Sequence, residues 1–116
     1  MGLTNTASDL LPGTLELLVL KALVSGEKHG YGIVEHLRLA SDDVLQVGES
    51  ALYPALQRLL LNGWVAGEWG TSENNRRANF YRLTPAGKSR LGDETAAWNR
   101  LADAMTMALG TTRREI

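Results

Sequence analysis

The chain has 116 residues, of which 44% are hydrophobic and 22% charged, as expected for one globular domain. It contains no cysteine, which excludes disulfide bonds, thiolate metal sites and cysteine nucleophiles. Its formal net charge of −1 argues mildly against a general nucleic-acid binder, because affinity for DNA comes largely from neutralised phosphates. No apolar run approaches the roughly eighteen residues that a membrane span needs, and no signal pattern opens the chain. We therefore expect a cytoplasmic protein without a membrane span.

Residues 1–9 form a polar lead, and the first helix is predicted over residues 13–25, where apolar side chains lie on nearly every side. A helix that is apolar all round is buried all round. In so small a chain, this suggests that a second copy covers the far side of the helix, although packing in the chain's own core explains many of these residues.

After a turn at Ser25–Lys28, a second helix is predicted to open at His29. Gly30 and Gly32 are poor helix formers, so we expect another backbone to approach them closely. His29 and His36 have no third ligand nearby, and we predict no metal site.

A third helix is predicted to end at Asn62-Gly63, because glycine tolerates the left-handed position after a helix. Its apolar face carries leucines at helical spacing: Leu52, Leu56, Leu59 and Leu60. Its other sides are polar and free of carboxylates beyond Glu49; they carry Ser50, Tyr53, Pro54, Gln57 and Arg58. Since Pro54 lacks an amide hydrogen, the regular helix should begin just before it or bend there.

Two short strands are predicted next, at residues 64–69 and 79–84, separated by the polar tip Thr71–Arg77. Arg76 and Arg77 lie at this tip. An ordinary helix beside an ordinary hairpin would explain the leucines, but not the acid-poor helix face or the arginines at the tip. The order of a helix and a two-stranded hairpin with a basic tip is typical of a winged helix that binds DNA.

The last helix is predicted from Pro85 to about Leu109, with Thr84 as its N-cap. Leu91, Trp98 and Met105 recur every seven residues and Leu101 lies beside them, which indicates a seam for a partner helix. Packing of this face against its own domain is the alternative. Residues 110–116 form a short tail.

Five motifs occur in the order seen in PadR-like transcriptional regulators, over the stretch from about Leu10 to Leu91. They are Leu11-Pro-Gly-Thr-Leu-Glu-Leu-Leu-Val-Leu20, His29-Gly-Tyr-Gly-Ile33, Leu52-Tyr-Pro-Ala-Leu56, Asn62-Gly-Trp64 and Phe80-Tyr-Arg-Leu-Thr-Pro-Ala-Gly87. The chain resembles the short-tailed group of that family, because a single helix follows the hairpin. One departure is Ala51, which stands where the family usually has Thr or Ser, while a hydroxyl is present at Ser50.

The resemblance implies a mainly α protein with a small β-hairpin (α+β). A winged helix-turn-helix over residues 10–84 would be followed by a dimerisation helix over residues 85–109. It further implies a homodimeric repressor, often responsive to a small molecule and active on its own promoter. On a near-palindromic operator, the two reading helices would lie roughly 34 Å apart.

Insertion of the third helix into the major groove would bring Ser50, Tyr53 and Gln57 near base edges or flanking phosphates. Pro54 shares that face, and Arg58 would lie nearer the backbone. Glutamine suits adenine and arginine suits guanine, although most such contacts go to phosphate and sugar. Other candidates for phosphate contact are the wing arginines Arg76 and Arg77, and the hydroxyl of Tyr31, for which packing is the alternative role.

Trp98 is the candidate for ligand sensing, since an aromatic residue facing its symmetry mate could stack a flat apolar effector, with Met105 as adaptable lining. Plain interface packing is the alternative. No catalytic constellation or phosphate-cradling loop is found, so we expect neither an enzyme nor a bound cofactor. The main rival function is a winged-helix module that binds proteins and not DNA.

Overall fold

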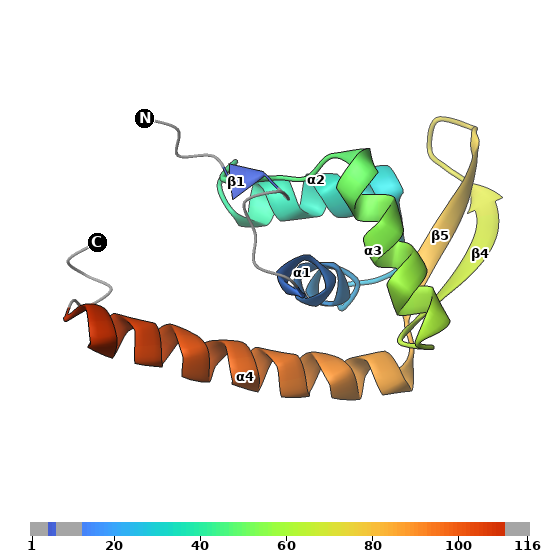
Figure 1. Ribbon diagram of the computed structural model, residues 1–116. Coiled ribbons are helices and arrows are strands. Elements are labelled where there is room, and N and C mark those ends of the chain that lie inside the picture. The colour runs from blue at the N-terminus through green and yellow to red at the C-terminus, as the bar shows by residue number, and fades with distance from the viewer. Residues whose placement is uncertain (1–4, 7–12, 111–116) are drawn as a thin grey trace.

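The computed structural model describes residues 5–6, without their side chains, and residues 13–110 with theirs. Apart from Asn5, Thr6 and Gly110, the predicted lead and tail lie outside the described residues. Four helices and five strands follow one another along the chain (Figure 1): β1 (Asn5–Thr6), α1 (Thr14–Ala22), β2 (Lys28–His29), α2 (Gly30–Ala40), β3 (Leu45–Gln46), α3 (Glu49–Leu61), β4 (Val65–Thr71), β5 (Arg77–Leu83) and α4 (Pro85–Leu109). Among the described residues, no helix combines the length and apolar character that crossing a membrane requires.

The hydrophobic core lies where α1, α2 and α3 meet. Leu52, Leu56 and Leu59 are at most 1% exposed, as their helical spacing predicts, and they pack with Leu20 and Ile33 from the other two helices. Burying one such side chain contributes roughly 1.5–3 kcal/mol to stability. The leucine face of α3 therefore fixes which side of this helix points to solvent.

The described residues form two sheets: β1 and β3 pair in parallel, and a larger antiparallel sheet has three strands in the order β2-β5-β4. The prediction of a two-stranded hairpin was incomplete, because Lys28 and His29 pair with Tyr81 and Phe80 and form a third, two-residue strand. So short a strand has no periodicity of its own, and Lys28 was wrongly assigned to the preceding turn. The hairpin strands also extend further toward the tip than predicted, to Thr71 and from Arg77.

The end of the first helix and the start of the third helix differ from their predicted positions. The first helix stops at Ala22 instead of Ser25, because residues 23–25 form a turn. The third helix begins at Glu49, ahead of Pro54, which lies inside the helix. The proline ring removes only the amide that would have bonded the carbonyl of Ser50, one turn earlier, so the first turn forms before it.

The start of α4 is fixed to the connection between α3 and β4. Thr84 Oγ1 accepts a hydrogen bond from the Gly87 amide at 3.0 Å and donates one to the Gly63 carbonyl at 2.7 Å. A Cβ atom on Gly87 would lie 1.9 Å from the carbonyl oxygen of Trp64, so only glycine fits there. The predicted N-cap at Thr84 and helix bounds at Pro85 and Leu109 are confirmed.

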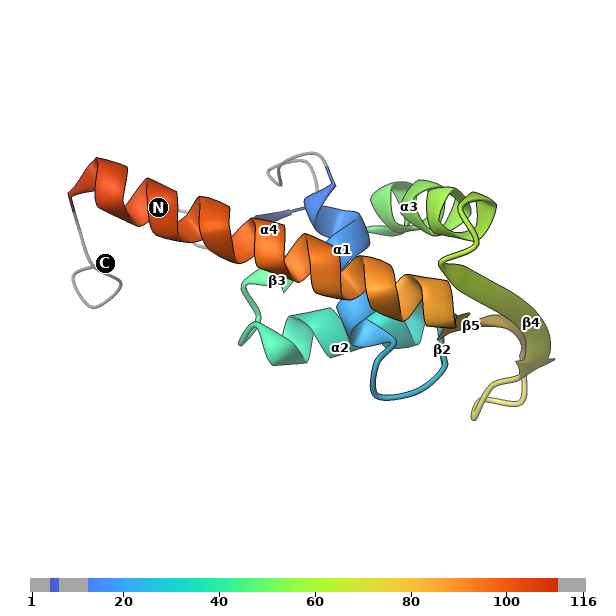
Figure 2. The same ribbon diagram turned by 90° about the horizontal axis from the view of Figure 1, so that it is seen from below.

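The first part of α4 packs against α1, and the rest extends beyond the helical core (Figures 1 and 2). The protein is accordingly elongated, with extents of 50 × 33 × 22 Å. Helix α3 and the β4–β5 hairpin lie at the opposite end from the projecting part of α4 (Figure 1).

Candidate nucleic-acid interface

The outward face of α3 carries the residues predicted from the sequence. All five are exposed: Ser50, Tyr53, Pro54, Gln57 and Arg58. Tyr53 lies on the side of the helix nearer the hairpin, where it lines a hollow with wing residues. Pro54 and Arg58 lie on the other side, where they line a hollow shared with α1 and α4. The structure therefore brings the predicted residues of α3 to one solvent-facing surface.

Arg58 is bonded to Glu16 of α1. Its Nε donates to Glu16 Oε1 at 2.8 Å, and Nη2 contacts the same oxygen. The side chain of Glu16 is 19% exposed and that of Arg58 is 58% exposed. The guanidinium predicted to contact the DNA backbone thus has a carboxylate partner within the protein.

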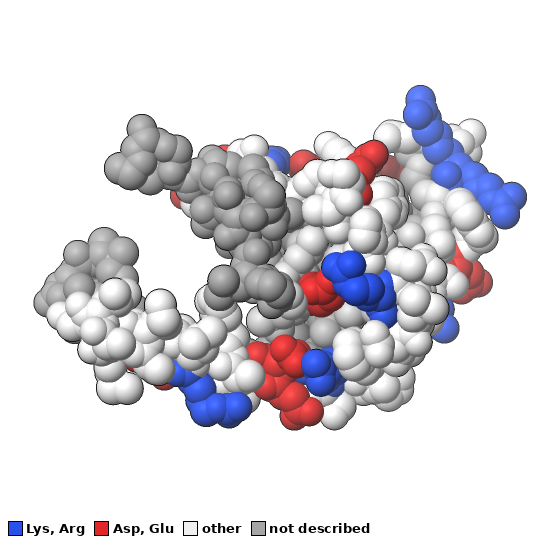
Figure 3. Space-filling view, in the orientation of Figure 1, with Lys and Arg blue, Asp and Glu red and all other residues white. Residues whose placement is uncertain are grey.

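The hollow between α2, α3 and the hairpin is here called the wing groove. It has a volume of about 550 Å³ and is lined by Gly30 and Tyr31 of α2, Tyr53 of α3, and hairpin residues that include Trp69, Arg76, Arg77 and Tyr81. Two arginines and no carboxylate line it. Figure 3 shows Lys and Arg side chains at the end of the β4–β5 hairpin, whereas acidic and basic side chains alternate near the middle of the same face.

Tyr53 explains why glycine opens α2. A Cβ atom on Gly30 would lie 2.6 Å from the Tyr53 hydroxyl oxygen. The close approach predicted at this position is real, but it is made by a side chain of α3 and not by another backbone. Gly32 has only ordinary neighbours, the nearest being Lys28 Cβ at 3.4 Å. Burial, with a smaller contribution from the neighbouring Tyr53, raises the pKa of the Tyr81 hydroxyl.

His29 caps α2. Its Nδ1 accepts from the Gly32 amide at 3.1 Å, and its ring meets Phe80 edge-on at 5.4 Å. Its Nε2 lies 4.0 Å from a carboxylate oxygen of Glu73 in the wing loop. Within residues 13–110, no group of three His, Asp or Glu side chains is arranged to hold a metal ion.

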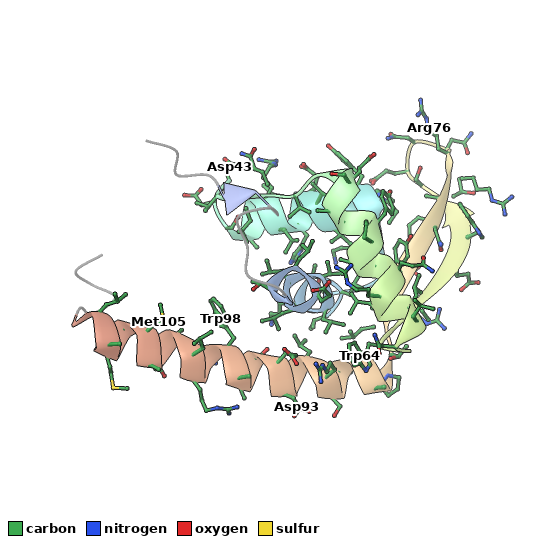
Figure 4. All side chains as sticks on the ribbon, viewed as in Figure 1. Asp43, Trp64, Arg76, Asp93, Trp98 and Met105 are labelled. Atoms are coloured by element: carbon green, nitrogen blue, oxygen red, sulfur yellow. The ribbon has the colours of Figure 1, made fainter. Side chains whose placement is uncertain are left out.

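The connection from α2 to α3 is held by Arg38. This side chain bonds Glu35 at 3.0 Å and also contacts the carboxylate of Asp43 (labelled in Figure 4). The bond from Arg38 lowers the pKa of Glu35, and the two carboxylates raise the pKa of Arg38. Asp42 and Asp43 both have positive φ, at 53° and 68°, which short polar side chains tolerate. These contacts set the path of the chain into the reading helix.

The wing tip presents both predicted arginines. Arg76 lies at the outer end of the loop (Figure 4), and the turn beneath it is closed by a bond from the Ser72 amide to the Arg76 carbonyl at 2.8 Å. Arg77 lies over the ring of Trp69, with its Cζ 4.9 Å from the ring centroid. Trp69 was not among the predicted site residues. The alternation of β4 could have indicated it, because Trp69 shares a sheet face with buried Val65.

The predicted dimer seam divides into two parts. Trp98, Leu101 and Met105 are 42%, 45% and 52% exposed, and Figure 4 shows Trp98 and Met105 on the same side of α4. Leu91, in contrast, is half-buried and packs against the core of its own domain. Only the part of the seam beyond Leu91 is therefore left open, next to a small hollow of about 170 Å³ that Trp98 and Leu101 line with the start of α1.

Tyr31 is 69% exposed, and it lines the wing groove beside Tyr53. Its hydroxyl end is thus open to solvent, on the same side of the molecule as the wing arginines. Of the predicted DNA-binding residues, the structure gathers Tyr31, Tyr53, Arg76 and Arg77 around one groove, and places Arg58 outside it.

Comparisons with known proteins agree with this architecture. The chain is similar to the solved structure of a transcriptional regulator from Clostridium thermocellum, with 27% identity, a TM-score of 0.75, and coverage of 82% of this chain and 92% of that one. It is similar to a PadR family transcriptional regulator from Eggerthella lenta, with 32% identity, a TM-score of 0.72, and coverage of 86% and 85%. An uncharacterised protein from Lysinibacillus sphaericus is 23% identical over 86% of this chain and 92% of its own length.

The sequence profile of the Transcriptional regulator PadR-like family matches residues 19–93, which run from within α1 into α4. The match spans the reading helix and the whole wing. Members of this family are transcriptional regulators and not enzymes, and their winged helix binds DNA. The chain therefore belongs to the PadR-like family of transcriptional regulators.

Proposed function

We propose that the protein is a transcriptional repressor that binds a near-palindromic operator as a homodimer, in the cytoplasm. The observation that carries the proposal is the exposed, polar face of α3 beside a wing groove that holds two arginines and no carboxylate. The protein as a whole has a net charge of −1, so binding of DNA would depend on a surface from which carboxylates are absent and on which arginines are present.

The position of each predicted DNA-binding side chain on α2, α3 or the hairpin suggests the part of the DNA that it would contact. Ser50 and Gln57 lie on the most outward part of α3 and would read base edges in the major groove. Tyr53 and Tyr31 would contact a phosphate or sugar at the edge of the groove, and Pro54 would pack against the same strand. Arg76 and Arg77 would neutralise phosphates or enter a narrowed minor groove beyond the reading helix.

Dimerisation is assigned to α4. Its exposed apolar residues Trp98, Leu101 and Met105 lie beyond the point where Leu91 packs on its own domain. A solvated helix would gain little from such a stripe, whereas a second copy of α4 would bury it by coiled-coil packing. Two-fold symmetry would then place the two reading helices on successive major-groove faces, roughly 34 Å apart.

Trp98 is also the proposed contact for a small aromatic effector. Its indole is 42% exposed, and the hollow beside it is lined by Leu17 and Leu101. A flat apolar molecule stacked there, with Met105 as flexible lining, would alter how the two copies of α4 pack. A change in that packing would alter the separation of the reading helices and hence the affinity for the operator.

The deciding experiment is a mobility-shift titration with the DNA upstream of the protein's own coding region, at two salt concentrations, against random duplex. A repressor gives a saturable shift that outcompetes random duplex and weakens steeply with salt. The rival function, a winged-helix module for protein contacts, predicts negligible affinity for duplex DNA even at low salt. Selection of binding fragments from a random pool separates that outcome from an operator located elsewhere.

A further inference from the structure

Trp69 is a large exposed aromatic residue on the wing, 59% open to solvent. Single exposed apolar side chains are common on protein surfaces, so exposure alone does not indicate a function for Trp69. Its position on the sheet is the more informative observation. In the β4–β5 register, Trp69 pairs with Asn79, and the next pairs on the same sheet face are Gly67–Tyr81 and Val65–Leu83. Because Val65 and Tyr81 are buried in the core, this face points toward α3. Trp69 therefore extends the inner face of the sheet beyond the core and into the wing groove.

The indole holds one of the two wing arginines. Arg77 Cζ lies 4.9 Å from the centroid of the Trp69 ring, within the range of a cation–π interaction. The contact favours an arginine conformation that lies along the groove, although Arg77 itself is exposed. Arg77 and Trp69 thus form one surface, charged at one end and apolar at the other.

The two sides of the Trp69 ring face hollows whose lining residues differ in charge. Trp69 borders the wing groove, which has no carboxylate among its lining residues, and also a hollow of about 340 Å³ lined by Glu27 and Glu68. Glu68 on the second side lies 3.9 Å from Arg82, which offsets part of its charge, whereas the first side carries two arginines and no lining carboxylate and therefore favours a polyanion. The remaining acid nearby is Glu73, which is 87% exposed in the wing loop and faces His29 at 4.0 Å.

We propose that the wing groove holds one sugar–phosphate strand of duplex DNA, with the Trp69 indole packed against a deoxyribose and Arg77 paired with the adjoining phosphate. This inference rests on the proposed function and deepens it. A deoxyribose offers an apolar C–H surface that fits an indole, and its phosphates alternate with it along the strand. The contact reads no base, so it strengthens binding to every sequence alike.

Hydroxyl-radical footprinting tests the contact directly, because the radical cleaves DNA by attacking the deoxyribose. The probe is a duplex that wild-type protein has selected from a random pool, at protein concentrations that saturate it. Wild-type protein should protect the sugars under α3 and a further sugar on the flanking strand. Trp69→Ala should lose the flanking protection and keep the rest, and its affinity should fall roughly tenfold on selected and random duplex alike.

Two variants make the result specific. Trp69→Phe keeps a flat ring and should retain the flanking protection. Leu39→Ala removes another exposed apolar side chain, 68% open on α2, and should bind like wild type. Thermal unfolding of each variant shows that the fold is intact; if Trp69→Ala is unfolded, the Phe variant and Trp69→Gln replace it in the comparison.

The outcomes separate the two proposals. If wild-type protein protects the duplex and Trp69→Ala gives the same flanking protection and affinity, Trp69 does not contact the strand and the inference is wrong. If wild-type protein protects no duplex at all, the proposed function fails, and the inference fails with it. If Trp69→Ala loses protection of the flanking sugar and keeps the protection under α3, the result supports both the proposed function and the inference.

Discussion

Arg58 of the reading helix donates to the Glu16 carboxylate of α1, with 2.8 Å between Nε and Oε1. The pair joins α3, the helix proposed to face DNA, to the first helix of the core. If Arg58 contacts a phosphate as proposed, the Glu16 carboxylate would compete with DNA for two of its donors, Nε and Nη2. Under that proposal, the acid on α1 would weaken DNA binding although it lies on another helix.

Replacing Glu16→Gln should raise the affinity for DNA by about three- to tenfold, since Arg58 is then free to pair with a phosphate. The slope of log affinity against log salt should steepen by about 0.9, the value for one added phosphate contact. Fluorescence anisotropy at several salt concentrations measures both. The fold should lose less than about 1 kcal/mol, because Arg58 is largely solvated.

Glu94→Gln is the matched control for Glu16. It breaks another Glu–Arg contact, the 2.6 Å pair of Glu94 with Arg90 on α4, and should leave the salt slope unchanged. A wild-type slope and affinity for Glu16→Gln would show that Arg58 makes no phosphate contact.

The double substitution Arg76→Ala with Arg77→Ala should weaken binding to operator and random duplex alike. The salt slope should flatten by about 1.8, because two phosphate contacts are lost. Arg82→Ala is the control, since Arg82 lies on the opposite face of β5, 3.9 Å from Glu68. If the double variant titrates like wild type at every salt concentration, the tip does not contact DNA.

Gly30→Ala should lower DNA affinity while changing thermal stability little. The new methyl group would lie 2.6 Å from the Tyr53 hydroxyl oxygen, and the end of that side chain would have to move. Gly32→Ala, two residues along the same helix, meets its nearest neighbour at 3.4 Å and should bind as wild type. Equal affinity of Gly30→Ala and wild type would rule out a DNA contact that depends on the position of Tyr53.

Tyr53→Ala should weaken operator binding without unfolding the protein.

Gly87→Ala should be severely destabilising, by roughly 3 kcal/mol or more, because its Cβ would lie 1.9 Å from a backbone carbonyl that cannot move freely. Gly92→Ala in the same helix has no atom within 4 Å of the new methyl and should stabilise by up to about 1 kcal/mol. Chemical denaturation of the two variants gives the comparison. Similar midpoints would contradict the tight packing of α4 on Trp64.

Trp98→Asp should convert the proposed dimer to monomers, since a carboxylate would replace the largest side chain of the exposed stripe on α4. Sedimentation velocity measures the change, and operator affinity should fall with it because one half-site contact is lost. Leu91→Asp is unsuitable for this purpose, since Leu91 packs on its own domain. A Trp98→Asp protein that remains dimeric would place the interface elsewhere.

Periodicity was enough to identify the helices and the solvent-facing side of α3. The spacing of Leu52, Leu56 and Leu59 predicted which side of α3 is buried, and Thr84 with Pro85 predicted the start of α4 to the residue. These features depend on neighbours in the sequence, so the sequence reports them. The two-residue strand β2 depends on Tyr81 and Phe80, far along the chain, and left no local pattern.

The partners of the site residues were equally inaccessible. Arg58 and Glu16 are separated by 42 positions, and no spacing rule connects them. The glycine at position 30 did signal a close approach, but not that a tyrosine of another helix makes it. Trp69 was overlooked because its alternation with Val65 and Gly67 was interpreted only as a strand.

Thr84 has one further consequence. Its hydroxyl bonds the turn that ends α3, and the same residue caps α4, so these two helices meet at one hydrogen-bonded joint. In a dimer built on α4, any tilt of one copy of this helix against the other swings the reading helix about that joint. Under the proposed function, the distance between half-sites that the protein accepts would then be set by the crossing angle of two helices that lie outside the proposed DNA-binding surface.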